Sequence, residues 1–417
     1  MKHIPYGKQS IDDKDIESVC SVLRSEWLTQ GPKVGEFEEA LCEKYGVKHC
    51  ILTANGTMAL QLACMAIDMS HGKIGLTSPI SFMASANCIA FCGGRPDFAD
   101  IDPRTLCISP ERVEEYCRKG QVPDVVIPVD FAGIPADLPR LKNLSESYGF
   151  KIIEDAAHAI GSTYQYGKKE YACGSCAHAD MAVFSFHPVK TITTGEGGAV
   201  LTNDVHLAEK VRLLANHGIE RDSHKFSNPN FQIPNPQAPP AWYHEMHALG
   251  LNGRITDIQC ALGLSQLKRI DMFKAKRQEI VRKYNQAFED LVKKQIVGLP
   301  PWPEGTDPCF HLYPLRLGPQ CSIGRDELFL KLREKGIYSQ IHYIPIYRQP
   351  FYQESYRLQI ERFPEAERYF AQCLSLPLFP DMDDITFHYV ADALLFLLQN
   401  VEGNAIGTAS ILRPVKP

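Results

Sequence analysis

The sequence lacks a long apolar run, a disulfide pattern and an excess of charge. No apolar stretch among its 417 residues reaches the roughly 18 that a membrane-spanning helix needs. Its 14 cysteines do not follow the spacing of a disulfide framework, and residues 1–6 do not resemble the start of a signal peptide. The net charge of −5 argues against nucleic acid or an anionic membrane as a partner. We therefore expect a cytoplasmic protein with reduced thiols.

Two common types of cofactor motif are also missing. Cys173-Gly-Ser-Cys176, with His178 nearby, could be a redox pair or half a zinc site, but no second CxxC or spaced His pair follows. A turn packed with small residues is the favoured interpretation, and no metal is predicted. The first predicted strand runs into Ala54-Asn-Gly-Thr57 rather than GxGxxG, which disfavours a dinucleotide-binding oxidoreductase. The first 30 residues are too short and too acidic for the DNA-binding domain of a regulator.

Strands and helices alternate over about 200 residues. Apolar patterns predict strands at 49–53, 73–78, 95–99, 124–130, 151–154, 181–186 and 198–202, with helices at 10–26, 34–45, 58–67, 82–91 and 138–148. This alternation predicts an α/β fold with a largely parallel sheet. Residues that follow the strands, among them Asn55 to Thr57, Phe82, Asp155 and Lys190, should then meet at the carboxyl edge of that sheet.

The remaining chain predicts a second, smaller domain. Residues 222–248 read as an irregular insert, and a long helix is expected over 256–292. Strands at 311–317 and 338–343 and helices at 325–335, 365–374 and 384–398 follow. We expect a large α/β domain at 1–265, a linking helix and small α+β domain at 266–398, and a poorly ordered tail at 399–417.

One lysine follows the buried strand at 181–186. Lys190 by itself is typical of a surface loop, and Asp155 could be a simple helix cap. An anion-binding turn at 55–57, an aromatic ring, a carboxylate and a lysine are together the groups that pyridoxal 5′-phosphate (PLP) requires. The lysine forms a Schiff base, and the carboxylate keeps the ring nitrogen protonated. The combination therefore favours a PLP enzyme over either separate interpretation.

Several blocks in order resemble the DegT/DnrJ/EryC1/StrS family of sugar aminotransferases over roughly residues 5–395. The blocks are Asn55-Gly-Thr-Met-Ala-Leu60, Ser78 to Asn87, Glu154 to Gly161, Ser185 to Lys190, Gly195 to Gly198, His217-Gly218 and Leu249 to Gln259. The resemblance implies PLP fold type I, the fold of aspartate aminotransferase. A lysine at 190 argues against the dehydratases of this family, which carry histidine there.

The resemblance also implies a role for each matching residue. Lys190 would form the Schiff base and carry the proton between the two substrate carbons. The cofactor would further contact Asp155 at the ring nitrogen, Phe82 on the ring face, Gly56, Thr57 and Ser185 at the phosphate, and His158 beside the phenolic oxygen. His158 stands where many relatives carry Gln. Asn252 matches an asparagine that reaches the phosphate from the partner subunit, which implies a homodimer with shared sites.

Within the family, the resemblance is strongest to the aminotransferases of pseudaminic acid biosynthesis. These use L-glutamate to aminate a UDP-linked 4-keto-6-deoxy-N-acetylamino sugar. The resemblance places the nucleotide sugar against Tyr6, Glu26, Trp27, Leu28, Thr29, Ile341, His342, Tyr343 and Ile344. A nucleotide-sugar aminotransferase of the perosamine or 4-amino-arabinose type is the alternative, because motifs encode nucleotide and sugar stereochemistry poorly. The insert and tail look longer than the family pattern.

Overall fold

A seven-stranded mixed sheet forms the centre of the protein, for which a computed structural model describes residues 3–227 and 240–399. The strand order is β2-β10-β9-β6-β5-β3-β4, and only β10 runs against its neighbours. The bounds are β2 (His49–Thr53), β3 (Ile74–Thr77), β4 (Arg95–Phe98), β5 (Val125–Ile127), β6 (Lys151–Asp155), β9 (Met181–Ser185) and β10 (Gly198–Thr202). The predicted α/β fold with a largely parallel sheet is thereby confirmed.

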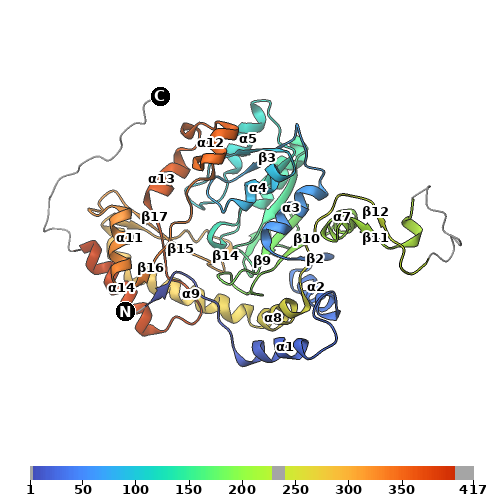
Figure 1. The fold of residues 1–417 in the computed structure, drawn as a ribbon. Coiled ribbons are helices and arrows are strands. Elements are labelled where there is room, and N and C mark those ends of the chain that lie inside the picture. Colours follow the sequence, from blue (N-terminus) through green and yellow to red (C-terminus); the bar gives the residue numbers. More distant parts are fainter. Residues whose placement is uncertain (1–2, 228–239, 400–417) are drawn as a thin grey trace.

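Successive side chains of each strand point to opposite faces of the sheet, and both faces are buried. Ile51, Val183 and Val200 pack with α3 (Gly56–Ala66), α4 (Ala84–Phe91) and α7 (Val205–Ala215) on one face. On the other face Leu52 and Phe184 pack with α2 (Pro32–Tyr45) and α8 (Asp257–Leu267), while Val126 packs with α5 (Pro110–Arg118) and α6 (Leu138–Tyr148). Helix α1 (Asp13–Leu23) lies beside α8 at the lower edge of Figure 1.

A smaller antiparallel sheet anchors a second apolar cluster. It contains β13 (Val297–Gly298), β15 (Tyr313–Leu317) and β17 (Cys373–Leu376) and packs against α9 (Ile270–Ala287), α10 (Glu289–Lys293), α11 (Arg325–Glu334) and α14 (Asp384–Gln399). The chain's first strand, β1 (Ile4–Pro5), pairs with β16 (Ile337–Tyr338), so the N-terminal segment also lies beside this cluster. The division of the chain at residues 265 and 398 stays a prediction.

Some predicted elements differ from the observed ones. The single helix predicted over 256–292 is wrong, because the chain breaks between α8, α9 and α10. The break escapes periodicity because Leu267, Ile270 and Phe288 stay buried across it. The strand predicted at 338–343 ends at Tyr338, and the following residues instead line a cavity. The helix predicted over 365–374 also ends earlier: helix α13 spans Pro364–Gln372, and Cys373 already belongs to β17.

Several short elements were not predicted. They are the helices α5, α7 and α12 (Pro350–Tyr356) and the antiparallel set β7 (Thr163–Tyr166), β8 (Lys169–Ala172) and β14 (Thr306–Asp307). Helices α5 and α7 carry the N-caps Ser109 and Asp204, which accept hydrogen bonds from first-turn N–H groups. These caps are visible in the sequence and are the signal that could have located both helices.

The predicted irregular insert contains regular structure at its ends. Strand β12 (Glu245–Met246) pairs with β11 (Ile219–Glu220), and a 3₁₀ turn spans Ser223–Lys225. This pair projects from the body beside α7 in Figure 1. Residues 228–239 of the insert and 400–417 of the predicted tail lie outside the described residues. Among the described residues, no helix has the length and apolar character to cross a membrane.

Candidate functional site

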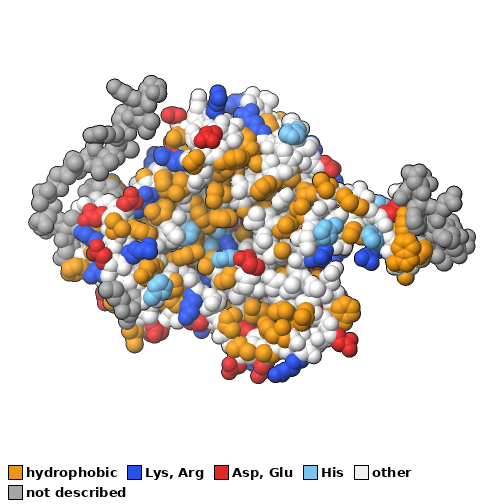
Figure 2. All heavy atoms as spheres, viewed as in Figure 1, with side chains coloured by type: hydrophobic (Ala, Val, Ile, Leu, Met, Phe, Trp, Pro, Cys, Tyr) orange, Lys and Arg blue, Asp and Glu red, His pale blue; other side chains and the backbone are white. Residues whose placement is uncertain are grey.

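A cavity of about 930 Å³ opens at the carboxyl ends of the central strands. Its lining includes residues that follow β2, β3, β6 and β9, as well as Tyr6 and the segment 340–344. The strand-end residues predicted to converge, namely Asn55, Gly56, Thr57, Phe82, Asp155 and Lys190, all line this one cavity, as do His158 and Ser185, which the family resemblance indicated. Figure 2 shows histidine and acidic side chains near the middle of this face, surrounded by apolar side chains.

The start of α3 provides an anion site. Asn55 caps the helix by accepting the Met58 N–H at 2.8 Å. The first N–H groups of a helix have no intrahelical partner, so those of Gly56 and Thr57 are available where these residues line the cavity. A Cβ on Gly56 would lie 2.8 Å from the Ser185 Cβ, so only glycine lets the two segments approach this closely. The turn therefore suits a phosphate group.

Adding one methyl group at Gly56 should weaken PLP binding. The Gly56→Ala side chain must push Ser185 away, and overpacking of about 1–3 kcal/mol corresponds to at least a roughly fivefold higher dissociation constant. Equilibrium dialysis of the apo-protein against PLP measures this. Gly35→Ala in α2 is the matched control, because its Cβ meets nothing within 4 Å. Equal affinities of the two variants would contradict the assignment of the turn.

Asp155 ends β6 at the floor of the cavity. Its carboxylate accepts the Ser85 hydroxyl at 2.6 Å and the Ala157 N–H at 3.2 Å. Burial raises the pKa of Asp155, while the two hydrogen bonds and the charge of Lys190 oppose that rise. Ser85 in turn contacts Ser81, with 2.7 Å between the hydroxyl oxygens. The side chain is thus fixed by two strong contacts and suits a cationic ring nitrogen.

Lys190 lies in the turn after β9. Burial lowers the pKa of Lys190 to about 8, although the Asp155 and Cys309 charges oppose the shift. The threonines after it hold the turn: Thr193 donates to the Phe186 carbonyl at 3.0 Å and Thr194 to the Glu196 carbonyl at 2.7 Å. The Thr run therefore fixes the loop by hydrogen bonds. The lowered pKa increases the share of neutral amine, which is the form that attacks an aldehyde.

The lowered pKa of Lys190 predicts the pH dependence of cofactor uptake. The rate of covalent PLP uptake by the apo-protein should rise with pH, because only the neutral amine attacks, should be half-maximal near pH 8 and should level off above it. For an unperturbed lysine the half-maximal rate would lie near about 10.4. Stopped-flow absorbance measures the rate, with acetyl-lysine amide run in parallel as the reference. A plateau that coincides with the reference would contradict the burial effect.

Four histidines, His158, His187, His311 and His342, line the cavity that holds Lys190. His158 Nδ1 accepts the Ala132 N–H at 3.3 Å, and its Nε2 lies 3.3 Å from the Tyr343 hydroxyl. Burial, with help from the Lys190 charge, holds the pKa of His158 well below its usual value, so the ring is neutral. Because Nδ1 accepts, the single proton is on Nε2 and points to the Tyr343 oxygen. The Tyr343 O–H is then left to donate to a bound molecule.

His311 and Ser85 line the cavity but were not predicted from the sequence. The centroid of the His311 ring lies 4.4 Å from that of His158, with the rings tilted by 49°, and the buried Nδ1 of His311 has no hydrogen-bond partner among the described residues. No local motif marks His311, since its neighbours Phe310 and Leu312 are buried apolar residues just before β15. Ser85 lies in the block at 78–87, where its four-residue spacing from Ser81 could have been noted. The unpartnered His311 Nδ1 at the cavity wall can therefore bind a polar atom of a ligand.

Predicted substrate and cofactor residues fall into two groups. Tyr6, Ile341, His342, Tyr343 and Ile344 line the cavity, and His342 is fixed through a 2.9 Å contact with Ser375. By contrast, Asn252 and the residues Glu26, Trp27, Leu28 and Thr29 are exposed and do not line it. The Leu28 carbonyl accepts the N–H of Asp257, the first residue of α8. Asn252 lies close to the same point, because Gly253, the next residue, is only four positions before Asp257. Both segments therefore flank the start of the same helix.

The Cys173–Cys176 pair is part of a buried turn. Both thiols are free, and the Cys176 thiol donates to the Leu201 carbonyl at 3.2 Å. His178 contacts the Tyr164 hydroxyl at 2.8 Å instead. Gly174 between them has a φ of +89°, and a Cβ there would lie 2.2 Å from Phe184. The pair therefore packs the turn before β9.

Comparison with known proteins identifies the class. The DegT/DnrJ/EryC1/StrS aminotransferase family matches residues 9–395, so the chain belongs to that family. It is 36% identical over 405 residues to the UDP-4-amino-4,6-dideoxy-N-acetyl-beta-L-altrosamine transaminase of Campylobacter jejuni (strain 81-176), with 97% of this chain and 100% of the relative covered. Another relative is the spore coat polysaccharide biosynthesis protein SpsC of Bacillus subtilis, 34% identical, with 96% and 98% covered.

Solved structures show the same fold. The Helicobacter pylori aminotransferase PseC, described as involved in the biosynthesis of pseudoaminic acid, superposes with a TM-score of 0.84 at 30% identity, covering 95% of this chain and 100% of that one. A sugar aminotransferase of Streptococcus pneumoniae in its PMP form superposes with a TM-score of 0.82 at 25% identity, covering 95% and 99%. The fold is PLP fold type I, and the chain is a PLP-dependent aminotransferase.

The cavity fits this cofactor. The α3 N-terminus against Ser185 suits a phosphate, the Asp155 carboxylate suits the ring nitrogen, and Lys190 offers an amine with a lowered pKa. Phe82, which is 53% exposed at the cavity, leaves its ring free to stack. When bound, PLP supplies an electron sink for the carbanion that forms at a substrate carbon.

Proposed function

We propose that this chain transfers the amino group of L-glutamate to C4 of UDP-2-acetamido-2,6-dideoxy-beta-L-arabino-hex-4-ulose, a step of pseudaminic acid biosynthesis. The observation that carries the proposal is the shared cavity: Lys190 and Asp155 lie in the same space as Tyr6 and Ile341 to Ile344. The printed names of the relatives from Campylobacter jejuni and Helicobacter pylori support the sugar.

In this proposal the chain's own residues divide the work. Lys190 Nζ takes the proton from the α carbon of glutamate and later delivers a proton to C4 of the sugar. The Asp155 carboxylate holds the cofactor ring in its cationic form, and Gly56, Thr57 and Ser185 hold its phosphate. Phe82 lies on the ring face, and His158 lies at the phenolic oxygen and orients Tyr343. Tyr6, Ile341, His342, Tyr343 and Ile344 contact the nucleotide sugar.

A panel of nucleotide sugars tests the substrate. The purified holoenzyme is incubated with glutamate and, in separate reactions, with three 4-keto nucleotide sugars. They are the UDP-linked 4-keto-6-deoxy-N-acetylamino sugar, the GDP-linked precursor of perosamine and the UDP-linked precursor of 4-amino-arabinose. We expect kcat/KM to be highest for the UDP-linked 4-keto-6-deoxy-N-acetylamino sugar. A preference for either of the other two would replace the proposed substrate with the perosamine or 4-amino-arabinose type, while leaving the aminotransferase class intact.

We further propose a homodimer with shared sites. Asn252 and Glu26 to Thr29 flank the start of α8, where Trp27 and Leu28 are 55% and 48% exposed. Exposed apolar side chains on one surface are typical of an interface. In a dimer this surface would present Asn252 to the phosphate, and Glu26, Trp27, Leu28 and Thr29 to the sugar, in the partner's cavity. The cytoplasmic location likewise stays a prediction.

Mixing two inactive variants tests the shared site. Lys190→Ala and Asn252→Ala should each be defective alone. When they are unfolded together and refolded at equal amounts, about half of the dimers are mixed, and each mixed dimer has one cavity with both native residues. Activity should therefore recover to about a quarter of the wild-type value. Separately refolded samples, mixed afterwards without exchange, are the control. If co-refolding restores nothing, the two residues belong to one cavity of one subunit.

A further inference from the structure

Two more carboxyl groups are buried directly behind Asp155. Glu154 precedes it in β6 and is 1% exposed, and the pleat directs the two side chains to opposite faces. Asp130, just after β5, is fully buried, and its N–H donates to the Asp155 carbonyl at 3.1 Å. The Asp130–Glu154 pair therefore joins the ends of two neighbouring strands at the position of Asp155.

The hydrogen bonds of this pair are incomplete without a proton. Both oxygens of Glu154 accept the Gly174 N–H at 3.1 Å, and Asp130 Oδ1 accepts the Ala136 N–H at 2.8 Å. Asp130 Oδ2 is buried without a donor. One carboxyl oxygen of Asp130, one carboxyl oxygen of Glu154 and the sulfur of Cys173 lie within 4.8 Å of one another. Since Asp130 Oδ2 faces an acid and a thiol, a protonated carboxyl is the strong donor available to it.

No cation compensates the pair in the described part of the chain, where neither carboxyl forms an ion pair. The ionisable groups around it are Asp155, Cys107, Cys173, Cys176 and Tyr164, and none of them carries positive charge. Two unpaired buried carboxylates would be costly. Burial raises the pKa of Asp130 to about 7, and burial together with the Asp130 charge raises that of Glu154.

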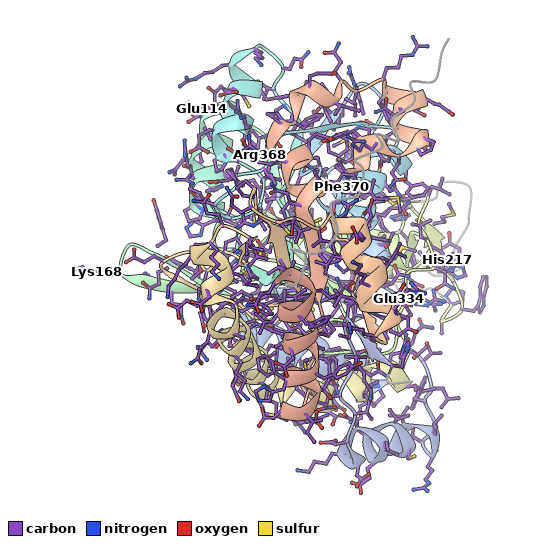
Figure 3. The ribbon with its side chains drawn as sticks, turned by 90° about the vertical axis from the view of Figure 1, so that its left-hand side faces the viewer. Glu114, Lys168, His217, Glu334, Arg368 and Phe370 are labelled. Carbon is purple, nitrogen blue, oxygen red and sulfur yellow. The ribbon has the colours of Figure 1, made fainter. Side chains whose placement is uncertain are left out.

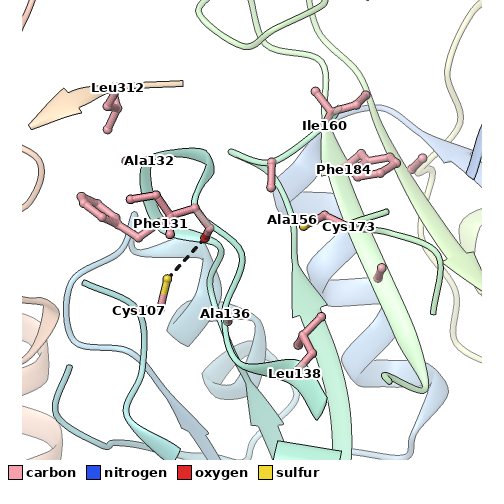
Figure 4. Packing of buried hydrophobic residues seen from close by; sticks show 14 of the residues in the cluster. Cys107, Phe131, Ala132, Ala136, Leu138, Ala156, Ile160, Cys173, Phe184 and Leu312 are labelled. Carbon is pink, nitrogen blue, oxygen red and sulfur yellow. Dashed lines mark hydrogen bonds between the residues drawn. The ribbon is translucent and has the colours of Figure 1, made fainter. Parts of the chain in front are cut away.

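We propose that Glu154 is held as a neutral acid that donates its proton to Asp130 Oδ2, and that this pair is a positioning element for Asp155. The contact fixes the ends of β5 and β6. It also leaves one negative charge near Asp155, which favours the cationic ring nitrogen opposite that side chain. Figure 4 shows the loop of Phe131, Ala132 and Ala136 on one side and, across from it, Ala156 and Cys173. The inference rests on the proposed role of Asp155.

Amide substitutions separate the charge from the hydrogen bond. Glu154→Gln keeps a neutral donor and the single charge on Asp130, whereas the double variant Glu154→Gln with Asp130→Asn removes all charge. In PLP holoenzyme, the pH midpoint of the cofactor's visible absorbance change is compared above pH 7, where Asp130 is ionised, and should stay at the wild-type position in Glu154→Gln. In the double variant it should fall by about one unit, because a nearby negative charge is lost. Glu170→Gln, on the exposed β8, is the control. Identical midpoints in all four proteins would overturn the proposal.

Unfolding of the apo-protein provides a readout without the cofactor. A carboxyl whose pKa is raised on folding stabilises the fold at low pH, and this stability is lost as pH rises through the folded value of about 7. The urea midpoint of the wild type should therefore fall between pH 5.5 and about 8, and that of the double variant should fall less. Equal pH dependence would overturn the shared proton, as would one metal ion per chain in elemental analysis. Failure of Asp155 itself would appear separately, as an unaltered Asp155→Asn enzyme.

Discussion

Replacing Lys190 with alanine should abolish turnover and covalent cofactor binding. In the proposed mechanism the side chain is both the attachment point and the proton carrier, because its amine is released when a substrate displaces it. A loss of about 10⁴-fold or more in kcat is expected, since no other lysine lines the cavity among the described residues. Turnover with glutamate and the nucleotide sugar measures the first loss, and the visible absorbance of the purified protein with added PLP measures the second.

Lys168→Ala is the matched control for that experiment. Lys168 lies at the tip of the β7–β8 hairpin, which projects from the body in Figure 3. The control should keep full turnover and the full absorbance band. An Lys190→Ala protein that retains the band of covalently bound cofactor would refute the assignment of this lysine.

The second large effect is expected for Asp155→Asn. Its amide retains the shape of the carboxyl and the contact with Ser85, but it cannot stabilise the protonated ring nitrogen. The rate should fall by about 10²- to 10³-fold, the size of effect found when one preorganised electrostatic group is removed. The protein should stay folded, because burial already raises the pKa of this carboxyl and a neutral amide therefore adds no desolvation cost.

Single-turnover kinetics and urea unfolding together check this prediction. Asp392→Asn, on the exposed side of α14, is the control for a charge removed elsewhere. If Asp155→Asn turns over at the wild-type rate, the carboxylate has no part in the electron sink. If its unfolding midpoint collapses, the rate loss reflects the fold.

Much of the sheet could be predicted because each strand is a short apolar run bounded by turn residues. The strands at 49–53 and 198–202 match the observed bounds of β2 and β10. The same reasoning failed where the apolar pattern runs on past the end of a regular element, as between the buried Leu267 and Ile270, and at Ile341 to Tyr343 after β16. There the apolar pattern follows the core, whereas hydrogen bonds decide where a helix or strand ends.

The site could be predicted from the sequence only where its reactive residues lie at strand ends. Asn55 to Thr57, Asp155 and Lys190 each follow a strand, and topology brings such residues together. His311 lies just before β15 of the small sheet, and Asp130 and Glu154 meet through neighbouring strands, so their proximity depends on side-chain packing that sequence order does not encode. Asn252 and Glu26 to Thr29 do not line the cavity of one chain, so the roles proposed for them require the proposed second subunit.

The most direct test is to locate the cofactor on the chain. The holoenzyme is reduced with borohydride, digested and sequenced by mass spectrometry, with Lys168→Ala treated in parallel. If this cavity is the active site of a PLP-dependent aminotransferase, we expect one reduced cofactor per chain, attached to Lys190. Attachment to a different lysine, or none at all in a protein that still transfers amino groups, would contradict it.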